Sequence, residues 1–245
     1  MTGKKRSRGP GPGFFRKVRN MKATVHDVEN FRNRRHLFTD RFDAGETLGE
    51  MMKPAYGNAE GCLILAIPAG GVPVGIRLRE ILGLPLDLLI VRKLKIPGNP
   101  EAGFGAMTLD GSTFLNRQLL AALRLGPSEI EAEKRRVATD LKKRNAFLRK
   151  GRPFPDLAGK KIILVDDGLA SGFTMLAAVD GVRKAKAAEV VVAVPTAPRS
   201  SIDRILPEVD GVYCPNIRTG PYFAVAEAYE TWYDLSEREV SDLLS

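Results

Sequence analysis

The segment KIILVDDGLASGFTM, residues 161–175, shows most clearly how this chain of 245 residues folds. Its apolar run Ile162–Val165 predicts a buried strand, because near-continuous Val, Ile and Leu residues are typical of parallel strands covered on both faces. Asp166 and Asp167 end the strand, and we expect a helix from about Gly172 to Lys186. In open α/β sheets ligands bind outside the carboxyl ends of the strands, so this loop marks a candidate binding site.

The loop itself has the composition of a phosphate cradle. Its glycines let backbone N–H groups turn inward, and the following helix N-terminus adds unsatisfied donors and a positive dipole end. Ser171 and Thr174 add hydroxyl groups, whereas Asp166 and Asp167 would repel a phosphate and suit the hydroxyls of an attached ribose. A strand-to-helix turn that binds nothing is the alternative. The segment matches neither the P-loop, since no lysine follows its second glycine, nor the GxGxxG dinucleotide fingerprint.

Similar apolar runs alternate with helical patterns along the rest of the chain. Three further apolar segments predict strands: CLILAIP (62–68), LDLLIV (86–91) and EVVVAVP (189–195). We expect one helix to begin near Asp43, whose carboxylate can cap it, and a second to follow residues 62–71 and end at Leu82. A third is expected from Pro127 to about Lys150. This alternation predicts an α/β fold with an open, mostly parallel sheet and helices on both faces.

Two segments depart from that alternation. RKLKIPGNPEAGFG (92–105) contains two prolines and three glycines and predicts a loop, and MTLDGSTFL (107–115) predicts a β-hairpin around Asp-Gly. From Gly211 onward the chain is richer in aromatic residues, which indicates a small hood or cap, or the last edge of the sheet.

The basic charge of the chain is concentrated at its N-terminus. The chain has 38 basic and 29 acidic residues, and residues 1–20 hold seven of the basic ones and no acidic one. The other 225 residues therefore carry 31 basic against 29 acidic side chains, so their charge does not require a polyanionic partner. We expect residues 1–22 to form a disordered basic tail and 23–245 to form one domain. Nucleic-acid binding is expected, if at all, through the tail, for which an overlong start is the other explanation.

Cys62 and Cys214 form no CxxC pair, so we interpret both as small buried hydrophobes and expect no structural zinc. No apolar run reaches the roughly 18 residues of a membrane-spanning helix, and we expect a cytoplasmic protein without a membrane partner.

The segment 163–175 resembles the 5-phosphoribosyl-1-diphosphate (PRPP) signature of type I phosphoribosyltransferases, in which apolar residues, two acids and a small-residue loop precede a threonine. The wider chain is similar to one branch, the predicted bacterial and archaeal phosphoribosyltransferases of unassigned substrate. The similar segments are FTDRFDAGETL (38–48), ILAIPAGGVPVG (64–75), VRKLKIPGNPEAGFGAM (91–107), FLN (114–116) and FAVAEAYETWYDLSEREV (223–240).

The resemblance implies a role for each part of the site. Asp166 and Asp167 would hold the ribose 2- and 3-hydroxyls, and Ala69, Gly70 and Gly71 would form the loop for the diphosphate. The loop from Gly168 would wrap the 5-phosphate, with its main contacts from Ala170, Ser171, Gly172 and Thr174. Magnesium would be held mainly through PRPP, with Asp166 and Asp167 as the possible protein ligands.

Catalytic roles fall on the segment after the second strand. Arg92 and Lys93 would stabilise the charge of the leaving diphosphate, although a solvated positive patch is the alternative. Residues 94–104 would form a mobile lid, in which Glu101 could accept a proton from the incoming nitrogen; exposed loop glutamates are more often only solvated.

The implied activity is transfer of the 5-phosphoribosyl group of PRPP to a nitrogenous base with release of diphosphate. A non-catalytic sensor of PRPP or nucleotides with the same fold is the alternative. Ala170 stands where hypoxanthine–guanine enzymes have an acidic base, which disfavours that class and leaves adenine-type and orotate-type acceptors open. The acceptor and the oligomeric state stay open, with a homodimer as one possibility.

Overall fold

The computed structural model describes residues 23–97 and 99–245, so the predicted tail, 1–22, lies outside the described residues. Its centre is a six-stranded sheet with the order β1-β10-β8-β7-β2-β3, in which every pair is parallel. The strands are β1 (Thr24–His26), β2 (Cys62–Ala66), β3 (Leu86–Leu88), β7 (Lys161–Val165), β8 (Glu189–Ala193) and β10 (Gly211–Tyr213). The predicted strand at 161–167 is thus the inner strand β7, between β2 and β8.

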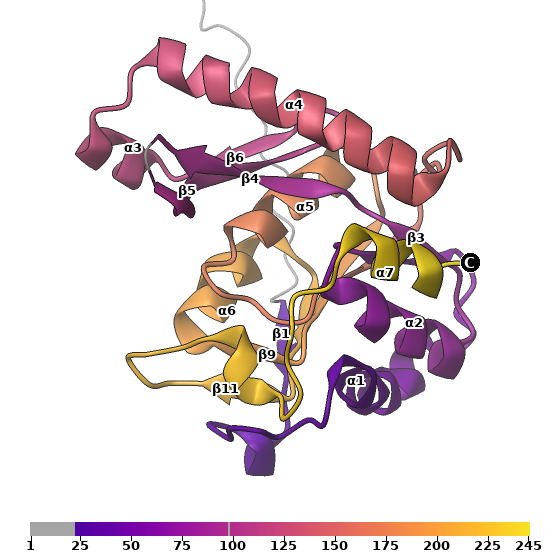
Figure 1. Cartoon of the computed structure of the whole chain (residues 1–245). Helices are drawn as coiled ribbons and strands as arrows, with labels where there is room; N and C mark the ends of the chain where they lie inside the picture. The colour runs from indigo at the N-terminus through magenta and orange to yellow at the C-terminus, as the bar shows by residue number, and fades with distance from the viewer. Residues whose placement is uncertain (1–22, 98) are drawn as a thin grey trace, which may run out of the picture.

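Side chains of β7 alternate between two apolar cores because successive residues of a strand point to opposite faces. Ile162 and Leu164 pack with apolar residues of α5 (Phe173–Lys184) and α6 (Arg199–Ile205). Ile163 and Val165 pack with α1 (Arg41–Tyr56) and α2 (Gly71–Leu82) on the other face. The predicted α/β class with helices on both faces is confirmed, and Figure 1 shows the two groups of helices on either side of the strands.

Helix α1 begins slightly earlier than its predicted cap. Asp40, not Asp43, is the N-cap, and its carboxylate accepts the N–H groups of Phe42 and Asp43. Asp43 instead accepts the N–H of Thr39 at 2.8 Å, so hydrogen bonds run in both directions across the helix start. Together these bonds set Arg41 as the first helical residue.

Residues 92–96 and 99–105 belong to the two paired strands of a β-hairpin, so the prediction of 92–105 as a loop is wrong. Strands β4 (Val91–Ile96) and β5 (Asn99–Thr108) pair antiparallel, and β6 (Thr113–Leu115) pairs with β5 across the predicted turn at 109–112. The glycines and prolines of this segment obscured its strand-like alternation of buried and exposed residues. Leu94 is buried, whereas Lys93 and Lys95 on either side are exposed. The predicted strand 86–91 is accordingly divided between β3 and the start of β4.

Helix α4 (Pro127–Arg149) begins at Pro127 as predicted, and it follows the short helix α3 (Arg117–Leu123). It lies across the small sheet, where Val137 and Leu141 pack on Leu94 and Phe104 (Figure 1). The small sheet with its covering helix therefore stands beyond the carboxyl ends of the main strands as one unit.

The C-terminal part of the chain returns to the central sheet. β10 enters that sheet, and β9 (Thr196–Pro198) pairs in parallel with β11 (Asn216–Arg218). The remaining elements are the short 3-10 helices η1 (Glu29–Phe31), η2 (Leu206–Glu208) and η3 (Val225–Ala228), and the last helix α7 (Glu237–Leu243), which packs near α4 and α2. Cys62 and Cys214 are both buried and free. Within 23–97 and 99–245, none of the helices has the length and apolarity to cross a membrane.

Candidate functional site

Two adjacent carboxylates stand at the carboxyl end of β7. Asp166 and Asp167 follow the last strand residue, and the Asp167 N–H donates to the Asp166 carboxylate at 2.9 Å. The Asp167 carboxylate accepts a hydrogen bond from Arg41 Nε at 2.9 Å, with the two side chains only 15% and 7% exposed. The start of α1 therefore delivers a positive charge to the end of β7, across 126 residues of sequence.

Burial and mutual repulsion act together on this pair. Burial raises the pKa of Asp166 well above its usual range, and the neighbouring charge of Asp167 raises it further. Burial also raises the pKa of Asp167, while Arg41 acts in the opposite direction. A ligand that brings hydroxyl donors or a cation to these oxygens would relieve the cost of holding both carboxylates ionised.

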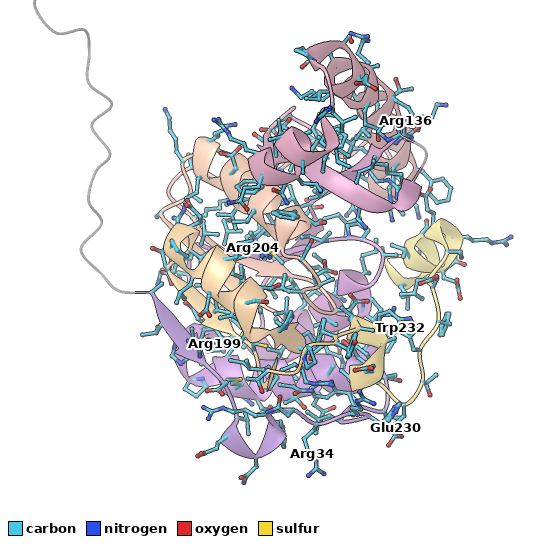
Figure 2. All side chains as sticks on the ribbon, turned by 90° about the vertical axis from the view of Figure 1, so that its left-hand side faces the viewer. Arg34, Arg136, Arg199, Arg204, Glu230 and Trp232 are labelled. Carbon is cyan, nitrogen blue, oxygen red and sulfur yellow. The ribbon has the colours of Figure 1, made fainter. Side chains whose placement is uncertain are left out.

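Three residues of the C-terminal segment, Tyr229, Trp232 and Tyr233, surround Arg41, and we call them the aromatic clasp. The Arg41 guanidinium lies 3.9 Å from the centre of the Trp232 ring, and its Nη1 donates to the Tyr233 carbonyl at 3.0 Å. Tyr229 is buried, and its hydroxyl donates to the backbone carbonyl of Asp167 at 2.6 Å. Burial raises the pKa of Tyr229, so this hydroxyl remains a donor. Figure 2 labels Trp232 on the yellow C-terminal segment.

Backbone hydrogen bonds tie this clasp to the segment before α1. The Glu230 N–H donates to the Phe38 carbonyl at 2.8 Å, and the Thr231 N–H donates to the Thr39 carbonyl at 2.9 Å. Sequence reasoning did not assign Arg41 to the site. The available signal was the position of Arg41 inside the segment 38–48, which resembles the family pattern.

The glycine loop after β2 touches the carboxylates directly. A Cβ atom placed on Gly70 would lie 1.7 Å from Asp167 Oδ2, and one on Gly71 would lie 2.6 Å from the Val165 carbonyl. The peptide bond before this pair, between Pro68 and Ala69, is cis. The structure thus brings the predicted diphosphate loop, 69–71, against the predicted ribose-binding carboxylates, and only glycine fits at this approach.

The predicted phosphate loop lines a cavity of about 260 Å³ below the β4–β5 hairpin. Gly172 has φ +78°, which favours glycine, and it caps α5. In the described part of the chain, the N–H groups of residues 170–172 have no protein acceptor. Across the cavity stands Lys93 of β4. The lining consists of Lys93, Gly103, Gly105, Ala170, Ser171, Phe173 and Thr174.

Gly168, at the start of the same loop, is closely packed. A Cβ atom there would lie 2.6 Å from the Val225 side chain, so this residue lets the loop pass beneath η3. The next N–H group, from Leu169, donates to the Thr196 carbonyl at 3.0 Å. The first part of the loop is therefore anchored to the protein, whereas Ala170, Ser171, Phe173 and Thr174 line the cavity.

The two predicted cations of β4 point in opposite directions because they are neighbours on one strand. Lys93 lines the phosphate-loop cavity, whereas Arg92 Nη2 lies 3.5 Å from Glu237 Oε1 of α7. Arg144 of α4 approaches the same carboxylate at 3.2 Å, and burial beside Arg92 lowers the pKa of Arg144 to about 10. The third predicted catalytic residue, Glu101, belongs to β5, but its side chain lies outside the described residues.

The donor set at this edge of the sheet suits a metal that is shared with a ligand. In residues 23–97 and 99–245, no group of three or more acidic, His or Cys side chains is placed to hold a metal ion. Asp166 and Asp167 supply carboxylate oxygens, and Mg²⁺ typically binds through one or two carboxylates together with substrate phosphates and water. The residues present therefore fit magnesium that arrives with a diphosphate ligand.

Comparison with known proteins places this site within one family. The model of the phosphoribosyl transferase domain matches residues 49–229, which include both glycine-containing loops and Tyr229. Two proteins of Mycobacterium tuberculosis, from strains CDC 1551 and H37Rv and each named "Putative phosphoribosyl transferase", are 36% identical over 204 residues, or 83% of this chain. That match covers 45% of their length, so the chain spans about half of these relatives.

A crystal structure of the protein TT1426 from Thermus thermophilus has a similar fold. It superposes with a TM-score of 0.70 at 33% sequence identity, and the match covers 84% of this chain and 97% of that protein. The fold over most of this chain is therefore shared with a solved structure.

Proposed function

Because this chain belongs to the family of phosphoribosyl transferase domains, we propose that it transfers the 5-phosphoribosyl group of PRPP to a nitrogenous base and releases diphosphate. One observation carries the proposal. The acidic pair after β7, the glycine loop after β2 and the small-residue loop before α5 adjoin at one end of the sheet, with Lys93 across the cavity of the last loop. A ribose that bears a phosphate at one end and a diphosphate at the other matches three such surfaces.

In this proposal each loop binds one part of PRPP. Asp166 and Asp167 accept hydrogen bonds from the ribose hydroxyls. The loop 168–174 receives the 5-phosphate, with the N–H groups of residues 170–172 and the hydroxyls of Ser171 and Thr174 as donors. The loop 69–71 receives the diphosphate, since two glycines let the backbone approach it closely. This division places the acidic groups at the ribose hydroxyls, and Arg41 offsets the charge of Asp167, which lies against the diphosphate loop.

The chemical step depends on positioning and on charge at the leaving group. As the bond to diphosphate breaks, positive charge develops on the ribose and negative charge on the diphosphate. Lys93 lines the cavity of the phosphate loop, whereas Arg92 would have to leave Glu237 to reach the diphosphate. Bound magnesium would neutralise diphosphate oxygens, and Asp166 and Asp167 are the residues that would hold it. We assign closure over the site to the β4–β5 hairpin, where Glu101 would accept the proton of the incoming nitrogen.

Turnover tests the activity. The full chain is mixed with magnesium, PRPP and a panel of purine and pyrimidine bases, and diphosphate release is measured. Base-dependent release is the expected result. PRPP binding without release for any base would favour the alternative, a sensor that uses the same pocket, and absence of PRPP binding would refute both.

Asp167→Asn tests the ribose-binding role. Asparagine keeps the shape and removes the charge that Arg41 and the ligand use, so we expect PRPP affinity in the presence of magnesium to fall at least about tenfold. Isothermal titration calorimetry measures the change, and Asp156→Asn, an exposed acid on the 151–160 loop, is the control. Unchanged PRPP binding by the Asp167→Asn variant would exclude this role for the carboxylate.

A further inference from the structure

Helix α6 holds the outer side of the phosphate loop by two carbonyl groups. Ser201, which is 1% exposed, donates from its hydroxyl to the Ala170 carbonyl at 2.5 Å. Arg204, one turn further along the helix, donates from Nη1 to the Ser171 carbonyl. No motif in the sequence pointed to α6, and neither side chain lines the cavity under the hairpin.

These two bonds fix the direction of the next two N–H groups. A trans peptide unit is planar, and the carbonyl of one residue points opposite to the N–H of the following residue. Since the carbonyls of Ala170 and Ser171 point toward α6, the N–H groups of Ser171 and Gly172 point away from it. The other side of the loop is the cavity that Ala170, Ser171 and Lys93 line, and within the described residues neither N–H has a protein acceptor.

Arg204 also braces the start of α5. Its guanidinium lies 5.2 Å from the centre of the Phe173 ring, and that ring stacks on Phe114 of β6 with centroids 6.0 Å apart. The contact joins the loop to the small sheet that forms the opposite wall of the cavity. Arg204 therefore restrains the loop at two points, Ser171 through its carbonyl and Phe173 through its ring.

We propose that Ser201 and Arg204 are positioning residues that aim the N–H groups of Ser171 and Gly172 at the 5-phosphate. The inference rests on the proposed function, because it takes the ligand of this loop to be a ribose phosphate. Neither side chain touches the ligand: each one holds a carbonyl so that the amide behind it stays available. Loss of either side chain lets the peptide unit rotate and weakens phosphate binding without changing the reacting atoms.

The variants are Ser201→Ala and Arg204→Ala, with Arg199→Ala as the matched control. Arg199 is also an exposed arginine of α6, but it pairs with Asp203 at 2.9 Å and does not bond to the loop. Figure 2 labels Arg199 and Arg204 on the same side of the molecule, so both substitutions perturb a similar surface. Arg204→Lys keeps a donor within reach of the carbonyl and serves as the conservative variant.

Calorimetry with ribose 5-phosphate, and separately with diphosphate, is the test. We expect Ser201→Ala and Arg204→Ala each to weaken ribose 5-phosphate binding about fivefold, the loss of one orienting hydrogen bond, while diphosphate binding stays as in the wild type. Arg199→Ala binds both ligands normally, and Arg204→Lys recovers part of the loss. In turnover assays the KM for PRPP rises and kcat at saturation is unchanged, because this contact is equal in the ground and transition states.

Other outcomes would overturn the inference in distinguishable ways. Normal ribose 5-phosphate binding by both alanine variants would show that α6 does not orient the loop. Equal losses for ribose 5-phosphate and diphosphate would indicate general damage to the fold rather than positioning. A wild-type chain that binds neither ribose 5-phosphate nor PRPP would refute the proposed function and the inference with it.

Discussion

Replacement of Arg41 by glutamine would test how much the site depends on one buried ion pair. The Arg41 side chain is 7% exposed and the Asp167 side chain 15%, so little solvent compensates for the loss of the partner. Removing one member of a buried pair typically costs about 3–5 kcal/mol. Because Asp167 still reaches some solvent, we expect the lower end, about 3 kcal/mol of unfolding free energy near neutral pH.

The stability loss caused by Arg41→Gln should depend on pH, and the burial of Asp167 determines whether that loss grows or shrinks as pH rises. Burial already raises the pKa of Asp167 above its ordinary value of 3.8, and Arg41 opposes that rise. Without Arg41 the folded-state pKa is higher still, so the folded chain holds a proton that the unfolded chain has released. Stability of the variant therefore falls as pH rises from the ordinary carboxyl range towards the folded-state pKa. At acid pH, where the carboxyl is protonated in both states, only about 1 kcal/mol from the lost stacking on Trp232 should remain.

Urea unfolding of both proteins at about pH 4 and about pH 7.5, on either side of the affected range, measures this difference. Arg77→Gln is the control, since Arg77 pairs with Glu46 and Glu80 on the surface of α2 and should change stability little at either pH. An Arg41→Gln penalty of the same size at both pH values would refute the electrostatic reasoning. It would indicate that packing against the aromatic clasp, rather than the charge on Asp167, is what Arg41 provides.

Two further predictions concern the walls of the site. Gly70→Ala should lower kcat/KM for PRPP about a hundredfold. The added Cβ atom would lie 1.7 Å from Asp167 Oδ2, so the carboxylate would have to move. Gly126→Ala, whose added Cβ would find its nearest atom at 3.6 Å, is the control, and wild-type kinetics in Gly70→Ala would contradict the close approach. Lys93→Gln should raise the KM for PRPP roughly tenfold, the loss of one charged contact. Arg92→Gln should change that KM less, since Arg92 pairs with Glu237, and steady-state kinetics with equal effects would contradict this assignment.

The part of the fold that follows from local pattern could be predicted from the sequence. The apolar run before Asp166 predicted a buried strand, and the small residues after Asp167 predicted a loop that leads into a helix, as the structure has them. The hairpin at 92–105 was missed because its glycines and prolines are also loop residues. In the structure Gly103 and Gly105 are strand residues that need the absence of a side chain: a Cβ atom on Gly103 would lie 2.3 Å from the Lys93 side chain.

Contacts between distant segments account for what the sequence could not supply. A single charge pattern, Arg92-Lys93, suggested one basic patch, but strand pairing sends the two side chains to opposite faces of β4. The partner of Asp167 lies 126 residues earlier, at the start of a helix whose own pattern describes only a cap. Local periodicity constrains each element by itself and says little about which side chain from another element will face it.

The placement of Arg41 explains how two carboxylates can stand side by side at the site that we propose for an anionic ligand. Without a cation, a diphosphate that approaches through the loop 69–71 would meet the charge of Asp167, which lies against Gly70. Arg41 neutralises that carboxylate from the side of α1. Its own position depends on the clasp, because Trp232 and the Tyr233 carbonyl occupy the rest of the guanidinium. The C-terminal segment thus contributes to the site through Arg41, and changes at Trp232 should act on PRPP binding although the ring is not one of the proposed ligand contacts.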